Sequence, residues 1–187
     1  MDALELSAVV YAPRDEAFEF LLDVANYGRY SEYVADVTQR GDGSVGTRFD
    51  ITLQWWTLSY TLRTAVTDLD RPNRIDWRVP DDVRAHGYWA VEEVDAGDSA
   101  SSAAGDSGVA SDGGPASRIR LRVEFDRDRS SARGLQLPPL VSTDWLLRRV
   151  KPVAKREAKQ VLSRAVADLE GQRRPVELAV HVRPTTL

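Results

Sequence analysis

The residues best suited to recognising another molecule are aromatic, and Trp55 and Trp56 are adjacent in the stretch QWWTLSY at 54 to 60. Aromatic surface of this size is normally buried in a core, or it lines a place where something else binds. No glycine, proline or asparagine separates the pair from the strand-like residues on either side. If such rings line a pocket with a few hydroxyl groups, the chemistry on offer is the binding of an apolar ligand.

Residues for acid–base, thiolate or metal chemistry are scarce. The 187-residue chain has no cysteine, which excludes disulfides, thiolate catalysis and thiolate metal sites. Its two histidines are His86, on the outward side of a predicted strand, and His181, near the C-terminus. The carboxylates show no ligand spacing with histidine, so the sequence predicts no metal site and no cofactor. No inward strand position carries Asp, Glu, Lys, Arg or His, so no catalytic residue is predicted.

The elements that must position the aromatic residues are strands, because apolar and polar residues alternate along much of the chain between residues 34 and 125. One-sided alternation repeated over successive segments predicts an antiparallel sheet with one wet face. The inward positions, segment by segment, are Val45, Thr47, Phe49, Ile51, Leu53 and Trp55; Leu58, Tyr60, Leu62, Thr64 and Val66; Ile75, Trp77 and Val79; Gly87, Trp89 and Val91; and Ile119, Leu121, Val123 and Phe125.

Helical patterns flank this predicted sheet. A strand at 3 to 11 is followed by an amphipathic helix to about residue 24 and by a short helix or turn at 26 to 33. An apolar stripe predicts a long last helix from about 142 to 170, with a kink or break at Pro152.

Two segments have little to bury. Residues 96 to 117 are mostly Gly, Ser, Ala and Asp, which predicts a disordered hairpin insert between two strands. Residues 173 to 187 are predicted to be a C-terminal tail, and they contain VELAVHV, a possible extra strand. The length of the chain indicates one domain, predicted at 1 to 172, followed by this tail.

The net charge and the hydropathy of the chain limit the kinds of partner and the cellular location that we expect. A net charge of −4 gives no reason to expect a nucleic-acid partner. The N-terminus has no basic segment followed by an apolar run, so no signal peptide is expected. No apolar run approaches the ~18 residues that a membrane-spanning helix needs. We therefore expect a cytoplasmic protein, and its oligomeric state is not predicted.

The order of these elements resembles the helix-grip fold of the START-like superfamily, also called SRPBCC or Bet v 1-like. The segment APRDEAFEFLLDVANYGRYSEYVADV, at 12 to 37, resembles the opening signature of that superfamily. RPNRIDWRV, at 71 to 79, resembles its Pro-x-x-Ile strand entry, and GYWAVEEVD followed by SRIRLRVEFD resembles its late hairpin. The resemblance covers about residues 3 to 171 and is nearest to the polyketide cyclase/dehydrase and coenzyme Q-binding branch.

The resemblance implies an α+β helix-grip fold. In that fold a curved antiparallel sheet wraps around a long C-terminal helix, with two short helices after the first strand. An apolar cavity between sheet and helix takes lipids, quinones, polyketides or plant hormones in this family, and the inward face would be its wall. Family cyclases place polar or charged groups in this pocket, so an inward face without Asp, Glu, Lys, Arg or His argues against cyclase activity.

The predicted ligand-binding residues are inward strand positions together with two positions on the last helix. Taken singly, each aromatic ring among them is more often a packed core residue. Trp56 breaks the alternation, so it lies either at a strand bend or bulge, or at a hairpin tip beside the cavity mouth. The predicted residues are Phe49, Leu53, Trp55, Tyr60, Leu62, Trp77, Trp89, Leu121, Val123, Phe125, Leu146 and Val150.

Three functions remain open from the sequence. The first is binding or transport of a hydrophobic small molecule, oriented by Tyr60, Thr47 and Thr64. The second is a cyclase or dehydratase that holds a flexible substrate in a reactive geometry. The third is an interaction module related to chaperone activators of the same fold.

A run of basic residues lies at the start of the predicted last helix. It is either a solvated face or a contact for anionic lipid headgroups. Its residues are Arg148, Arg149, Lys151, Lys155, Arg156 and Lys159.

Overall fold

The computed structural model describes residues 2–55, 58–80, 85–94, 114–125 and 160–182. Within these ranges the chain forms one eight-stranded sheet in the order β2-β3-β4-β5-β6-β7-β1-β8. Every neighbouring pair of strands is antiparallel. The strands and short helices are β1 (Asp2–Val10), α1 (Arg14–Leu22), the 3₁₀ helix η1 (Val24–Arg29), β2 (Val34–Arg40), β3 (Arg48–Trp55), β4 (Leu58–Asp70), β5 (Arg74–Val79), β6 (Ala85–Val94), β7 (Ala116–Phe125) and β8 (Ala179–Val182).

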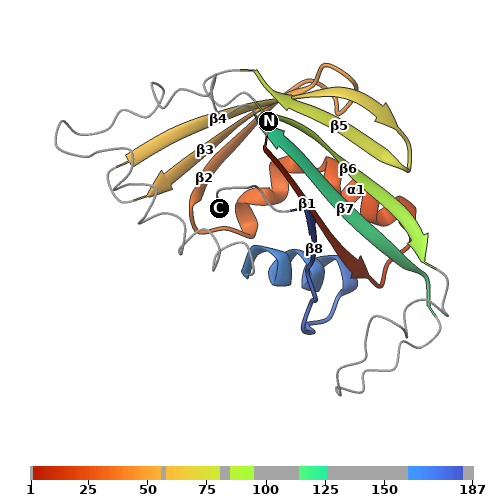
Figure 1. Ribbon diagram of the computed structural model, residues 1–187. Coiled ribbons are helices and arrows are strands. Elements are labelled where there is room, and N and C mark those ends of the chain that lie inside the picture. Colours follow the sequence, from red (N-terminus) through yellow and green to blue (C-terminus); the bar gives the residue numbers. More distant parts are fainter. Residues whose placement is uncertain (1, 56–57, 81–84, 95–113, 126–159, 183–187) are drawn as a thin grey trace.

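The sheet curves over the helices, and one face of it is concave (Figure 1). Helix α1 and a helical segment at residues 160–170 lie against this face, and both contribute side chains to the core cluster there. The prediction of an α+β helix-grip fold with two short helices after the first strand is therefore confirmed. Residues 142–159 of the predicted last helix, which include Pro152, lie outside the described residues.

Helix α1 supplies much of the core. Pro13 precedes it, where a fixed φ suits entry into a helix, and Asp15 and Glu16 complement the helix dipole in the first turn. Its apolar positions recur at three- and four-residue spacing, so they share one face and bury it against the sheet. The buried side chains of α1 are Ala17, Phe18, Leu21 and Leu22.

The strand register places the predicted inward residues on one face. Residues directly opposite each other in neighbouring strands share a face, and Trp77 pairs with Gly87, as Trp89 pairs with Leu121. Gly87 in turn pairs with Val123, so a continuous row crosses β5, β6 and β7. This face is the concave one, because its members pack with α1 in the core cluster. The alternation in the sequence therefore predicted the inward face correctly over these strands.

The start of β7 differs from the sequence prediction. Ala116 and Ser117, expected to end the disordered insert, belong to the strand and are buried. The hydroxyl of Ser117 donates to the carbonyl oxygen of Ala12 at 2.8 Å. Small polar residues indicate a loop in a sequence, but here their size lets the strand approach the segment after β1. Residues 95–113 of the insert lie outside the described residues.

The segment predicted as a tail returns to the sheet. Strand β8 pairs with β1, so VELAVHV does contain a strand and it is an edge of the main sheet. Ser7 on β1 is hydrogen-bonded to Nε2 of His181 on β8, at 2.7 Å. Just before β8, Arg174 donates to the carbonyl oxygen of Val9 at 2.7 Å and to the Glu170 carboxylate at 2.7 Å. These contacts attach residues 174–182 to β1.

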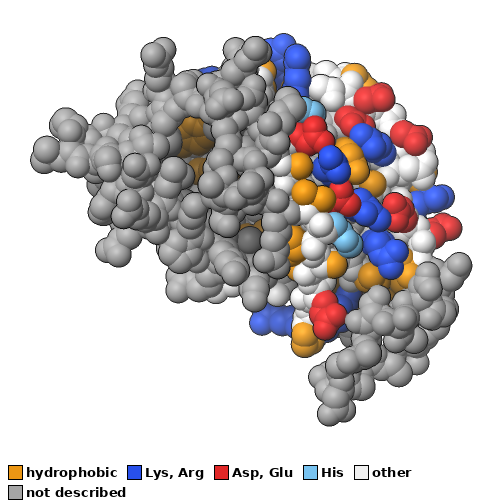
Figure 2. Space-filling view, viewed as in Figure 1, with side chains coloured by type: hydrophobic (Ala, Val, Ile, Leu, Met, Phe, Trp, Pro, Cys, Tyr) orange, Lys and Arg blue, Asp and Glu red, His pale blue; other side chains and the backbone are white. Residues whose placement is uncertain are grey.

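The opposite, convex face of the sheet carries paired charges. Figure 2 shows blue and red side chains interleaved over the described part of the surface. The Glu5 carboxylate accepts hydrogen bonds from Arg120 and Arg122 at 2.8 and 3.0 Å. Arg122 also pairs with Glu124 at 2.8 Å, and His86 Nε2 lies 3.3 Å from a Glu124 oxygen, on the outward side as predicted. Glu5 is only 9% exposed, so the arginines replace the water that its charge loses.

This convex network predicts acid sensitivity of the fold. The hydrogen bond from Arg120 lowers the pKa of Glu5, and the hydrogen bond from Arg122 lowers the pKa of Glu124. A lowered folded-state pKa contributes stability that is complete above the unfolded-state pKa and is lost as pH falls through the folded-state value. We therefore expect the urea midpoint of the wild type to fall steeply below about pH 4. In Glu5→Gln the midpoint should start lower at neutral pH and fall less; parallel curves would contradict this role of Glu5.

Candidate functional site

The concave face has a packed end and a less buried end. At the packed end, Phe49, Val66, Ile75 and Val91 are between 2% and 5% exposed and belong to the core cluster with α1. Towards the other end most of the side chains are only half-buried, although the same strands carry them; Val79, at the end of β5, is an exception at 6% exposed. We call this less buried zone the apolar wall: it consists of Leu53, Tyr60, Leu62, Trp77, Leu121 and Val123, with Trp89 at its border, where it also packs against the core cluster.

The remaining predicted ligand-binding residues do not join the apolar wall. Phe49 is a correction: it is 2% exposed and packs in the core, because β3 carries it to the end of the sheet that α1 covers. Trp55 and Phe125 lie at the ends of β3 and β7, and their side chains are not among the described ones. The positions outside the described residues are Trp56, Leu146 and Val150.

Of the three hydroxyl groups expected to orient a ligand, one is buried in a turn and two lie on the concave face. Thr47 is 2% exposed, and its hydroxyl oxygen accepts a hydrogen bond from the backbone N–H of Gly43 at 3.0 Å. Its polar atom therefore holds the β2–β3 turn, and the predicted orienting role of Thr47 is wrong. Tyr60 and Thr64 are half-buried on the concave face, opposite Leu53 and Phe49 respectively.

Trp77 occupies the middle of the apolar wall, and Gly87 leaves room for its ring. A Cβ atom at Gly87 would lie 2.9 Å from Cζ2 of the Trp77 indole, so the ring lies across the glycine. The indole Nε1 of Trp77 is buried and has no hydrogen-bond partner among the described residues. A tryptophan N–H usually finds a partner when it is buried. The apolar wall thus contains a hydrogen-bond donor, Trp77 Nε1–H, that has no acceptor among the described residues.

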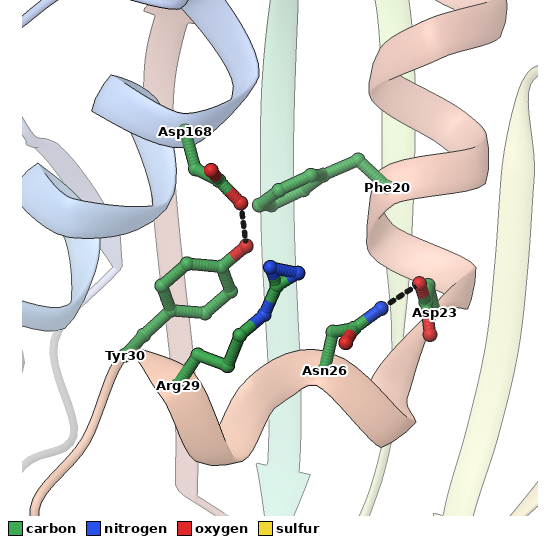
Figure 3. Close-up of a pocket in the computed structure, with 6 residues that line it drawn as sticks. All are labelled: Phe20, Asp23, Asn26, Arg29, Tyr30 and Asp168. Carbon is green, nitrogen blue, oxygen red and sulfur yellow. Dashed lines mark hydrogen bonds between the residues drawn. The ribbon is translucent and has the colours of Figure 1, made fainter.

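A second site lies between α1, η1 and the helix at residues 160–170 (Figure 3). It is a pocket of about 110 Å³ in which the Tyr30 hydroxyl donates to Asp168 Oδ2 at 2.5 Å. Arg164 donates to the carbonyl oxygen of Tyr30 at 2.8 Å. A volume of this size holds a few water molecules rather than a ring compound. The pocket is lined by Phe20, Asp23, Asn26, Arg29, Tyr30 and Asp168.

The hydrogen bonds in this pocket have a structural role. Burial raises the pKa of Tyr30 to about 12, and the hydrogen bond to Asp168 adds to the shift. The phenol is therefore protonated at neutral pH and remains a donor to the carboxylate. Since the two hydrogen bonds of Tyr30 both reach the helix at residues 160–170, they hold that helix to η1.

Sequence reasoning missed this pocket. Tyr30 and Asp168 are 138 positions apart, and no motif connects them. The polar and aromatic run DVANYGRY, at 23 to 30, indicated a helix or turn but not the side chain it would meet. Only the packing of the last helix against η1 brings the phenol and the carboxylate together.

The described residues can be examined for metal sites and for membrane-spanning helices. Within the described ranges, no group of three or more His, Asp or Glu side chains is arranged to hold a metal ion. No helix described here is both long and apolar enough to span a membrane. The basic run from Arg148 to Lys159, predicted as a solvated face or a lipid contact, lies outside the described residues.

Structures of the same fold come from several kinds of protein. The Zhui aromatase/cyclase from Streptomyces sp. R1128 is 17% identical, with a TM-score of 0.57 over 90% of this chain and 93% of that one. TTHA0849 from Thermus thermophilus is 13% identical, with a TM-score of 0.53 over 89% and 95%. Ara h 8.0201 is 14% identical, with a TM-score of 0.53 over 88% and 97%. Identities this low establish a shared fold.

The family assignment comes from the sequence as a whole. No curated protein sequence matches the chain. Residues 1–170 match the family described as polyketide cyclase/dehydrase and lipid transport. This match covers strands β1 to β7 and the helix at residues 160–170, whereas β8 lies beyond it. The fold is that of the START-like proteins which the sequence resembles. The chain therefore belongs to the polyketide cyclase/dehydrase and lipid transport family, within the START-like superfamily.

Proposed function

We propose that the protein binds a hydrophobic small molecule against the apolar wall, on the concave face of the sheet. The observation that carries this proposal is the gradient of burial along that face. On β3, Phe49 is 2% exposed and packs in the core, whereas Leu53, four positions along the same strand and on the same face, is half-buried. Apolar side chains that the protein's own core leaves half-buried gain free energy when a ligand removes them from water.

The affinity of such a site comes from buried apolar area, at about 25 cal/mol per Å² removed from water. Burying about 300 Å² of ligand and wall supplies about 7 kcal/mol before the entropic cost of association. Tyr60 and Thr64, both on the concave face, are the side chains proposed to orient the ligand. The chemical classes that suit this lining are quinones, lipids and polyketide-type ring compounds.

A second candidate is a cyclase or dehydratase, which the family membership favours. Such an enzyme would act by holding a flexible chain in a reactive geometry, so that shape does most of the catalysis. The apolar wall offers Tyr60 as its ionisable side chain, and general acid–base chemistry needs such a group within reach of the substrate. Turnover of a poly-β-ketone substrate that is abolished in Tyr60→Phe would favour the enzyme over the carrier.

The carrier proposal is tested by extracting the purified protein with organic solvent and identifying any co-purified apolar compound by mass spectrometry. A matched pair of variants on β7 then locates the site. We expect Leu121→Ala to weaken binding of 1-anilinonaphthalene-8-sulfonate about tenfold, equivalent to about 1.4 kcal/mol. Ile119→Ala should lower stability but leave affinity within about twofold, because its side chain packs on the core. Equal affinities in the two variants would argue against the apolar wall as the site.

An interaction module related to chaperone activators remains the third alternative from the sequence. Such a module would present aromatic surface to a protein and keep a filled interior. It predicts no extracted compound and no saturable binding of the naphthalene probe, so the same experiment separates it from the carrier.

A further inference from the structure

The apolar wall contains one unmet hydrogen-bond donor. Trp77 Nε1 is buried and has no acceptor among the described residues. Leaving such a donor unpaired is unfavourable, because the N–H has lost its hydrogen bond to water and gained no other acceptor. An unsatisfied buried group in a native structure needs an explanation, and a bound molecule that supplies the acceptor is one.

The surroundings of the indole explain why the described part of the protein does not supply that acceptor. On the concave face, Trp77 pairs with Val66 on one side and with Gly87 on the other, and Val123 follows Gly87. None of these three residues has a polar side-chain atom. The backbone groups of Gly87 and Val123 belong to the strand ladder and are directed along the plane of the sheet. Those of Val66 are hydrogen-bonded to the backbone of Gly46 and Thr47.

Gly87 also sets where the N–H edge of the ring lies. The atom nearest a Cβ at this glycine, within the indole, is Cζ2, on the edge of the ring system that also carries Nε1. Because Cζ2 and Nε1 are both bonded to Cε2, the N–H group lies near Gly87, and its neighbours across the strands are hydrophobic.

We propose that Trp77 is the polar anchor of the site, and that its ligand is an apolar ring compound bearing an oxygen acceptor, such as a ring ketone, which accepts the hydrogen bond of Nε1–H. This inference rests on the proposed function and deepens it by assigning the donor that recognises an oxygen of the ligand, which favours a ring ketone over a hydrocarbon. A purely hydrocarbon ligand would leave the indole N–H unpaired, so the site discriminates against it by the energy of that bond.

The test uses 9-fluorenone and fluorene, which share a tricyclic skeleton and differ in one ketone oxygen. We expect the wild type to bind 9-fluorenone about tenfold more tightly than fluorene, the equivalent of one neutral hydrogen bond. In Trp77→Phe, which keeps an aromatic ring but removes the N–H, the preference should fall to within about twofold. Trp89→Phe is the matched control: it alters the same face, so any weakening should affect both probes alike and keep the tenfold ratio.

Nuclear magnetic resonance gives a readout that does not depend on a variant's stability. The chain has five tryptophans, so a ¹⁵N-correlated spectrum contains five indole N–H signals. We expect one of them, absent in Trp77→Phe, to shift downfield with 9-fluorenone and not with fluorene. If no indole signal responds specifically to the ketone, the inference is overturned even where Trp77→Phe does not fold.

The failures of the two proposals are distinguishable. Equal wild-type affinities for the two probes overturn the role of Trp77 and leave the proposed function standing. A ketone preference that persists in Trp77→Phe likewise assigns the donor to another group. Binding of neither probe, together with no extracted apolar compound, contradicts the proposed function itself.

Discussion

Replacing Phe18 with alanine is expected to lower the free energy of unfolding by about 4 kcal/mol. Phe18 is 0% exposed, and it lies on the face of α1 that packs against the sheet. Its neighbours in the core cluster include Phe49 and Ile75 from the sheet and Val166 from the last helix, so truncation opens a cavity between the layers. The Arg71 guanidinium lies 5.4 Å from the centre of the Phe18 ring, and this cation–π contact is lost as well.

The same helix offers a matched control for Phe18. Phe20 is half-buried in the wall of the small polar pocket, where its ring centre lies 5.7 Å from that of Tyr30. Phe20→Ala should therefore cost only about 1–2 kcal/mol, from one aromatic pair and a partly exposed surface. Urea unfolding followed by circular dichroism measures both variants. A loss in Phe18→Ala no larger than that in Phe20→Ala would mean that α1 does not seal the core.

The second large effect is expected at Gly87, where alanine should cost about 3 kcal/mol. An added Cβ would lie 2.0 Å from the carbonyl oxygen of Arg122, far inside the contact distance of two heavy atoms. That oxygen belongs to the backbone of β7, which is paired with β6 on one side and β1 on the other. It can move only if the ladder is distorted. The same Cβ would push on the Trp77 indole at 2.9 Å.

Because Gly87 also seats the Trp77 ring, its replacement has a second readout. We expect Gly87→Ala to move the Trp77 indole signal and to weaken 9-fluorenone binding under conditions where the variant is still folded. Gly28→Ala is the control, since its Cβ would meet only Val34 Cγ1, at an ordinary 3.7 Å. That variant should stay within about 0.5 kcal/mol of the wild type. Tolerance of Gly87→Ala with wild-type stability would show that β6 and β7 are less closely apposed than described.

The alternation of apolar and polar residues predicted which face of a strand each side chain lies on, but not how deeply that side chain is buried. It assigned Phe49 and Leu53 to the same face of β3, and the strand register places them so. It could not show that Phe49 lies under α1 whereas Leu53 lies beyond the core, because depth depends on where a helix from elsewhere in the chain crosses the strand. The same limit explains Thr47, whose inward parity suggested a ligand contact and whose hydroxyl holds a turn.

Polar contacts between residues far apart in the chain could not be predicted from the sequence, for a related reason. Tyr30 and Asp168, or Glu5 and Arg120, are ordinary surface residue types when taken alone. Their roles arise from pairing, and a side chain contains no information about a partner more than a hundred positions away. Strand β8 was visible as a possible strand, but its place beside β1 follows from edge pairing that local pattern does not encode.

The sequence by itself determined the antiparallel sheet and its inward face, because the period of its hydrophobic residues is a local property of the chain. The helix-grip fold followed from the resemblance of its motifs and element order to the START-like superfamily. Tertiary structure alone decided which part of that face is core and which part is the apolar wall. It also decided that Trp77 lies across Gly87 with its N–H unpaired among the described residues. The physical reason is that burial and hydrogen bonding are properties of neighbours in space, and strand register and helix packing choose those neighbours.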